Sequence, residues 1–300
     1  MWLSLAFLSA LLLGFYDVAK KQALKGNAVP VVLLLNTLFS TILFSPVLLS
    51  SELGLGWFDG SIFSFTPQGV EAHLKIALKS AIVLSSWVFG YIGIKHLPLT
   101  IVGPINATRP VLVLLGALLI FGERLNLLQW AGVTLALFSI FLLSRAGRKE
   151  GINFTRNRWI LCVAAAALLG ATSGLYDRYI MRELEPLFVQ SWYNLYQVVM
   201  MAITVAVIAL CSGREALEWR WSWAIPMISL LLSAADLAYF VALSEGDAMI
   251  SVVSMIRRGS VVVSFACGAV LLREKNLKAK ALDLVFILVG MVLLWLGSRA

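Results

Sequence analysis

Long apolar stretches recur along the whole of this 300-residue chain and constrain its fold more than any other feature. A helix needs about 20 apolar residues to cross a hydrocarbon core about 30 Å thick. Only 13% of the residues are charged and 60% are hydrophobic, whereas soluble domains carry about 25% charged residues. We therefore predict membrane-spanning helices near residues 2–20, 29–50, 74–94, 98–121, 126–144, 158–181, 187–211, 222–244, 247–271 and 279–298.

The positive net charge of the chain does not indicate that it binds nucleic acid. The formal net charge is +8, but the charges are confined largely to short connectors, which is the usual pattern of membrane proteins. Cys162, Cys211 and Cys267 lack the spacing of a disulfide framework or of a metal site. We therefore expect the lipid bilayer as a partner, no nucleic acid, no metal site and no cofactor.

A basic, polar connector at residues 146–157 divides the chain into two parts, 1–145 and 158–300, with five predicted helices each. Because five is an odd number, the second part must cross the membrane in the opposite sense to the first. The predicted fold class is an all-α integral membrane protein of about ten helices, arranged as two inverted five-helix repeats.

A short motif supports the repeat. Gly14-Phe-Tyr-Asp17 in the first predicted helix recurs as Gly174-Leu-Tyr-Asp177 in the sixth, at nearly the same distance from the start of each half. Internal symmetry of this kind is common in secondary transporters.

Spaced residues in the first half match a known pattern. Pro110 stands thirteen residues before Glu123, and Gln129 and Gly132 follow. Together with the ten-helix plan, this pattern resembles the EamA-type branch of the drug/metabolite transporter (DMT) superfamily over essentially the whole chain. The second half keeps Glu274 but has other residues where the pattern expects Pro, Gly, Gln and Gly, namely Val261, Arg273, Lys280 and Asp283. The resemblance implies a transporter of small molecules, and the superfamily's substrates include amino acids, nucleotide sugars and sugar phosphates.

Two arguments about orientation disagree. Connectors after odd-numbered predicted helices carry more Lys and Arg than the others, which by the positive-inside rule puts both termini outside. The family resemblance implies that both termini are cytoplasmic.

Three arginines lie near the middle of predicted helices. Arg109 lies halfway along the fourth, and Arg257 and Arg258 lie halfway along the repeat-related ninth. An unpartnered charge at this depth costs about 3 kcal/mol on insertion scales. A guanidinium keeps its proton and its planar fork matches carboxylate or phosphate, so these arginines are candidate ligands of an anionic substrate. The alternative is that Asp236 neutralises them inside the protein.

Asp236, the deepest acidic residue, has two interpretations of its own. It is either a fixed counter-charge to an arginine, which we favour, or a proton acceptor or partner of a substrate amine. Neutral polar residues offer further substrate contacts. Gln190, Asn194 and Gln197 share one face of the seventh predicted helix, and Asn36 lies in the second. This face either lines a cavity or forms hydrogen bonds between helices.

The duplicated pairs Tyr16-Asp17 and Tyr176-Asp177 lie toward the ends of their predicted helices. Interfacial anchoring explains them, with Asp17 reaching Lys20 or Lys21 and Asp177 reaching Arg178 or a neighbouring helix. Their duplication also suggests gates that close the two ends of a transport pathway.

We interpret the chain as a secondary transporter of the bacterial cytoplasmic (inner) membrane that moves a small, anionic or phosphorylated metabolite by alternating access. It has no Walker motif, so coupling to protons or exchange with a counter-substrate stays open. One alternative is a flippase for a lipid-linked substrate with a phosphate headgroup. Others are an accessory or scaffolding subunit and a membrane-embedded transferase or hydrolase, for which no catalytic constellation is seen, so we expect no enzyme.

Overall fold

The computed structural model describes residues 2–61, 63–109, 111–112, 126–148, 156–180, 183–212, 217–244, 256–271 and 277–297, and all regular secondary structure in them is helical. The helices are α1 (Trp2–Ala23), α2 (Val29–Glu52), α3 (Val70–His96), α4 (Leu99–Ala107), α6 (Leu127–Arg148), α7 (Arg158–Ile180), α8 (Pro186–Ser212), α9 (Ala224–Ser244), α11 (Ser260–Val270) and α12 (Leu277–Gly297). Each overlaps one predicted span, and the helices that overlap 98–121 and 247–271 cover only part of them, since 113–125 and 245–255 lie outside the described residues.

Five of the described helices, α1, α2, α3, α7 and α8, are long and apolar enough to cross a membrane. Exposed apolar side chains show which face of a helix lipid would contact. On α8, for example, Val199, Ile203 and Val207 are each at least half exposed and follow one another at four-residue steps. An aqueous surface would not favour such a stripe, so the chain is an integral membrane protein.

Local chemistry sets several helix ends. α7 begins at Arg158 because the Asn157 side chain accepts a hydrogen bond from the Trp159 backbone N–H at 2.9 Å, as an N-cap residue does. α3 ends at His96 because Leu97 precedes a proline and is extended. The Lys21 ammonium donates to the carbonyl of Ile94 and to that of Leu97, which satisfies acceptors at the end of α3.

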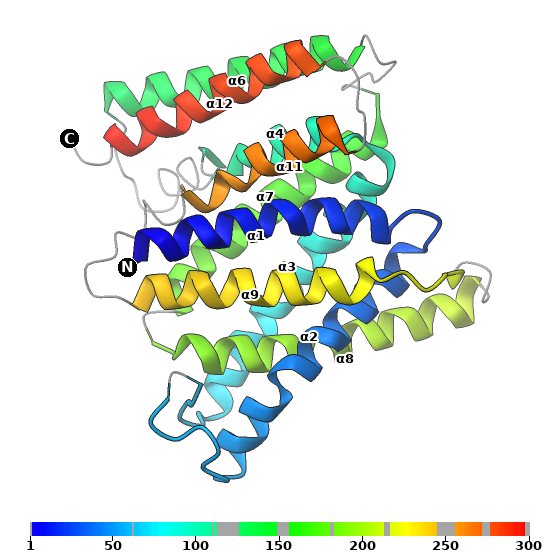
Figure 1. Ribbon diagram of the computed structural model, residues 1–300, viewed down its shortest axis with the longest axis vertical. Coiled ribbons are helices and arrows are strands. Elements are labelled where there is room, and N and C mark those ends of the chain that lie inside the picture. Colours follow the sequence, from blue (N-terminus) through cyan, green and yellow to red (C-terminus); the bar gives the residue numbers. More distant parts are fainter. Residues whose placement is uncertain are drawn as a thin grey trace.

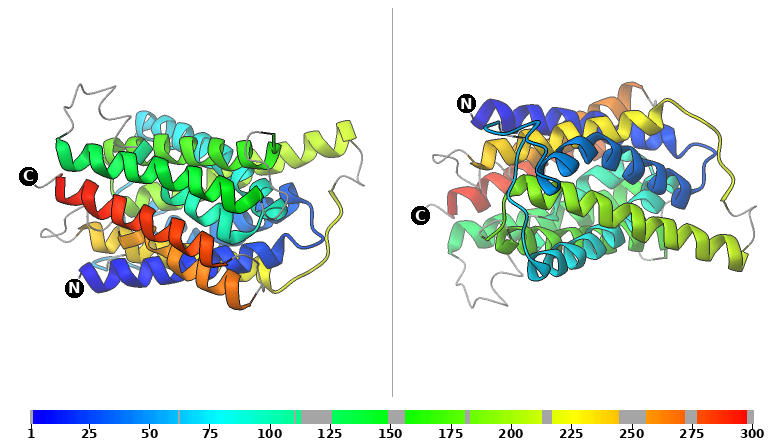
Figure 2. Two further views of the ribbon diagram at one scale, coloured as in Figure 1. Left: turned by 90° about the horizontal axis from the view of Figure 1, so that it is seen from above. Right: turned by 90° about the horizontal axis from the view of Figure 1, so that it is seen from below.

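The helices of the two halves pack in a symmetric pattern (Figures 1 and 2). α1 packs on α9 and, correspondingly, α3 packs on α7, while α2 packs on α8, α4 on α11 and α6 on α12. Exchanging the first five described helices for the last five leaves this pattern of pairs unchanged. The N- and C-termini lie at the same end of the bundle in both figures.

Small residues allow the close packing. Ala6 of α1 and Ala235 and Ala242 of α9 are fully buried where these helices meet. A Cβ atom added to Gly14 of α1 would lie 2.4 Å from Val263 of α11. Interfaces of small residues are typical of membrane helices, because backbones can approach closely there. The first glycine of the duplicated motif is therefore a packing residue, whereas a Cβ atom added to its counterpart Gly174 would meet no atom of the described residues of other elements within 4 Å.

Directions along the helices follow from their contacts. The Tyr16 and Tyr91 hydroxyls lie 3.1 Å apart and Lys21 contacts the end of α3, so α1 and α3 run in parallel. Ser86 contacts Ala166, and Lys79 contacts Asp177, so α3 and α7 run in opposite directions. α1 and α7, the first helix of each half, therefore run antiparallel, as inverted halves require.

Candidate functional site

Asp236 and Arg257 form an ion pair in which both side chains are mostly buried. The Arg257 guanidinium also lies over the Tyr239 ring, 4.2 Å from its centroid. The aromatic face and the carboxylate together stabilise this cation, although its Nε is buried without a hydrogen-bond partner among the described residues. Asp236 is thus placed as the counter-charge of one of the three arginines.

Arg109, just after α4, reaches across to α7 of the other half. Its Nη2 donates to the Asn106 side chain and to the Ala166 carbonyl, both at 3.3 Å. A Cβ atom at Gly170 would lie 2.6 Å from the guanidinium carbon, so this position must lack a side chain for the arginine to fit. The Arg109 Nε is buried and has no partner among the described residues. The guanidinium is therefore held by weak, neutral contacts.

Arg258 lies within electrostatic range of both Arg109 and Arg257. No carboxylate of the described residues forms an ion pair with Arg258 or with Arg109. The two arginines come from the repeat-related segments around α4 and α11, which pack together. The structure thus places two guanidinium groups within electrostatic range of each other at the contact between the halves. Neither has an ion-pair partner among the described residues, and the Asp17 carboxylate acts on both from further away.

Lys20, which the sequence analysis named as a partner of Asp17, belongs to the same group of charges. It is 7% exposed, forms an ion pair with Asp17 at 2.7 Å and lies over the Tyr16 ring at 4.2 Å. It also lies within electrostatic range of Arg109. We refer to Arg109, Arg257, Arg258 and Lys20 with Asp17 and Asp236 as the central charged cluster. Its four cations face two carboxylates, each of which is already paired with a cation.

The second Tyr-Asp pair has a different partner. Asp177 forms an ion pair with Lys79 of α3, which is 5% exposed and lies 5.4 Å from the centroid of the Tyr193 ring. This pair bridges the two halves, whereas Asp17 binds a lysine of its own helix. Tyr176 donates to the Lys75 carbonyl at 3.4 Å. The side chain of Arg178, the other expected partner of Asp177, lies outside the described residues.

The two pairs lie at different depths. Tyr16 contacts position 91 of α3, whereas Asp177 contacts position 79. Twelve residues of helix separate these positions, which corresponds to about 18 Å. Each pair lies toward the C-terminal end of its own helix. Because α1 and α7 run antiparallel, the two pairs therefore lie toward opposite ends of the bundle.

Neutral polar side chains complete the candidate site. Gln190, Asn194 and Gln197, which we call the amide face, are all at most 2% exposed on α8. The Gln190 carbonyl oxygen, the Asn194 amide nitrogen and both polar atoms of the Gln197 amide have no partner among the described residues. The Asn36 side-chain oxygen of α2 accepts a hydrogen bond from Ser229 of α9 at 3.0 Å. The Asn36 amide nitrogen also has no hydrogen-bond partner among the described residues.

The amide face lies beside the charged cluster. Tyr193, the neighbour of Asn194, is within electrostatic range of Asp236 and Arg257. α2, which carries Asn36, packs on both α8 and α9. A buried polar atom without a partner costs about 1–3 kcal/mol. These atoms are therefore available to water or to a ligand.

Comparisons with known proteins match this architecture. The model of the EamA-like transporter family matches residues 1–145 and, again, residues 157–296. A solved structure, titled only as the crystal structure of a protein, aligns with 99% of this chain and 98% of its own length at a TM-score of 0.63 and 18% sequence identity, which shows a shared fold. No curated protein matches the chain.

Proposed function

This chain belongs to the EamA-like transporter family and is therefore a membrane transporter of the drug/metabolite type, and from that premise we propose that it carries a small, anionic or phosphorylated metabolite. We place it in the bacterial cytoplasmic membrane, with ten crossings in two inverted repeats of 1–145 and 158–300 and a linker at 146–157.

One observation carries the choice of an anion. Arg109 and Arg258 lie within electrostatic range of each other and neither has a carboxylate partner among the described residues. Two like charges that lack an ion-pair partner inside a membrane protein repel each other and lack solvation. Asp17 acts on both from further away, but it is already paired with Lys20. A bound anion would remove both costs, and the planar guanidinium groups suit the two oxygens of a carboxylate or phosphate.

The neutral polar side chains support a substrate that carries hydrogen-bonding groups in addition to its negative charge. The amide face and Asn36 offer both donors and acceptors, since an amide carries an oxygen and an NH₂ group. A metabolite with hydroxyl or amide groups next to its anionic group would satisfy these atoms. A purely apolar substrate would leave them unpaired.

Transport by alternating access fits the two Tyr-Asp pairs. We propose that Tyr16 and Asp17 with their partners close one end of the pathway, and that Tyr176 and Asp177 with Lys79 close the other. The Lys79–Asp177 ion pair joins the halves, so it must break when the halves rock apart at that end. Proton coupling and exchange are both compatible with this scheme.

A thermal-stability screen of the purified full chain tests the substrate class. A ligand that binds the folded state raises the melting temperature by mass action. We expect stabilisation by some members of a panel of inorganic phosphate, sugar phosphates and organic carboxylates, followed by uptake of the stabilising compound into proteoliposomes. Stabilisation and uptake confined to amines or uncharged compounds would contradict the proposal.

A further inference from the structure

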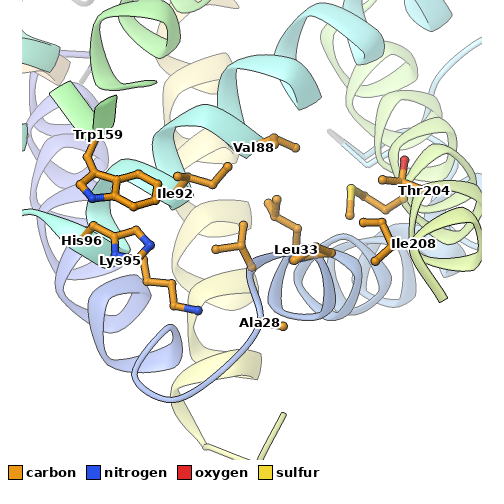
Figure 3. A pocket seen from close by; sticks show the side chains of 12 residues that line it. Ala28, Leu33, Val88, Ile92, Lys95, His96, Trp159, Thr204 and Ile208 are labelled. Atoms are coloured by element: carbon orange, nitrogen blue, oxygen red, sulfur yellow. The ribbon is translucent and has the colours of Figure 1, made fainter. Parts of the chain in front are cut away.

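A pocket separate from the charged cluster lies between α2 and α3 of the first half and α7 and α8 of the second. Its volume is about 400 Å³. Figure 3 shows the side chains that line it. The wall is formed mainly by apolar side chains, among them Leu33, Val88, Ile92, Met201 and Ile208. Thr204 is the polar side chain on the α8 wall, and its hydroxyl donates to the Met200 carbonyl of its own helix at 2.8 Å. This wall therefore offers hydrophobic contact.

The pocket adjoins an exposed apolar surface of α8, which lipid would contact in a membrane. Thr204 and Ile208 of the wall alternate along α8 with the exposed Ile203 and Val207. α8 is one of the helices long and apolar enough to cross a membrane. An apolar opening in this part of a bilayer is filled by hydrocarbon rather than by water.

One end of the pocket is basic. Lys95, His96 and Trp159 line it there, with the His96 and Trp159 rings stacked at 3.8 Å (Figure 3). The Arg158 guanidinium lies over the Trp159 ring, 4.3 Å from its centroid. The charged groups that act on His96 are Lys21, Lys95 and Arg158, all of them cations.

Lys95 and Arg158 can each donate further hydrogen bonds to a ligand. Lys95 donates one hydrogen bond to the Asn27 carbonyl at 2.8 Å, and an ammonium has three N–H groups. No ion pair of Lys95 or Arg158 occurs within the part of the chain that the structure describes. The end of α3 and the start of α7 are also where a membrane interface is expected, and a tryptophan is typical of that depth.

We propose that this pocket binds one acyl chain of an anionic phospholipid, whose phosphate group is held by Lys95, His96 and Arg158. Basic pockets between membrane helices bind anionic lipid headgroups in this way. The walls come from both halves, so the lipid would bridge the two repeats and favour the arrangement in which the pocket is formed.

Lipid binding to the purified full chain tests the proposal. Delipidated protein in detergent is titrated with phosphatidylglycerol or with phosphatidylcholine of identical acyl chains, and bound lipid is counted by native mass spectrometry. We expect phosphatidylglycerol to be retained preferentially. Lys95→Gln and Arg158→Gln should each weaken its binding about fivefold. Lys25→Gln is the matched control, because this exposed lysine lies at the same end of the bundle but does not line the pocket.

The wall provides a second, independent variant. Thr204→Phe adds volume at an exposed position of the wall and should reduce retention of phosphatidylglycerol without removing a charge. Melting temperatures without lipid establish that each variant is folded. Equal retention of the two lipids, or wild-type retention by both the charge variants and Thr204→Phe, would overturn the proposal. Movement of labelled phosphatidylglycerol between leaflets of reconstituted vesicles would also overturn it, since the lipid would then be cargo.

Discussion

Asp236 of α9 pairs with Arg257 and not, among the described contacts, with Arg109 or Arg258. One mid-helix arginine is thereby neutralised, and two are left for another role. We therefore regard Arg257, the partner of Asp236, as a structural cation, and we assign Arg109 and Arg258 to substrate binding.

The ion pair predicts a recovery of stability in a double variant. Asp236→Asn should lower the free energy of unfolding by about 3 kcal/mol, because it leaves Arg257 charged and unpaired in a mostly buried place. Arg257→Gln in the same background should restore most of this loss. Melting temperatures of the purified variants measure both steps, with the exposed Asp59→Asn as the control. Additive losses in the double variant would show that the pair is not coupled.

The amide face predicts opposite effects on stability and on binding. Gln197 is fully buried with neither amide atom paired among the described residues, so Gln197→Leu removes an unsatisfied group of similar size. The melting temperature should rise, by an amount that corresponds to about 1–2 kcal/mol. Affinity for the stabilising anion should fall about tenfold or more. Gln22→Leu, at an exposed position of α1, should change neither quantity.

The Lys79–Asp177 bridge predicts a shift toward a state open at that end. Cys162, Cys211 and Cys267 are free thiols, so they can be replaced before Ser80→Cys is introduced as a reporter beside Lys79. Asp177→Asn should raise the rate at which a water-soluble maleimide labels this reporter by about fivefold or more, which corresponds to about 1 kcal/mol. Asp59→Asn, at an exposed position of the α2–α3 connector, should leave the rate unchanged. Equal rates in all variants would rule out a gate at Asp177.

Membrane sidedness tests the inverted arrangement. Single cysteines replace Lys25, Asp59 and Glu183, which lie in the α1–α2, α2–α3 and α7–α8 connectors. Labelling in intact cells should place position 25 on one side of the membrane, and positions 59 and 183 on the other. The result also decides the orientation, on which charge bias and family resemblance disagree. Labelling of positions 25 and 183 on the same side would mean parallel halves.

The sequence was informative wherever a residue conflicted with its surroundings. Apolar length predicted the described helices closely, because a membrane fixes how long a spanning helix must be. Arg109, Arg257 and Asp236 stood out for the same reason, as charges in apolar stretches. The family resemblance, which rests on Pro110, Glu123, Gln129 and Gly132 in order, is confirmed by the family match over both halves.

The burial of Lys20 and the pairing of Lys79 were missed because both depend on tertiary packing. Both lysines lie within a few turns of a helix end, where lysine usually extends to the interface. Lys79 meets Asp177 98 residues further along the chain, and no local spacing encodes that contact. The i, i+3 spacing of Asp17 and Lys20 was visible, but the burial of Lys20 against Tyr16 and Tyr91 was not.

Arg109 and Arg258, which have no ion-pair partner among the described residues, give the strictest test of the proposed site. Arg109→Gln and Arg258→Gln should each abolish binding and uptake of the stabilising anion. Neither should destabilise the protein, because each removes a charge that has no carboxylate partner among the described residues, and a modest rise in melting temperature is expected. Arg109→Lys and Arg258→Lys should recover only part of the affinity, since a point charge replaces a bidentate fork. Uptake and melting temperature are measured on the same preparations. Full uptake by either Gln variant would remove that arginine from the site, and a large loss of stability with normal uptake would make it a structural residue instead.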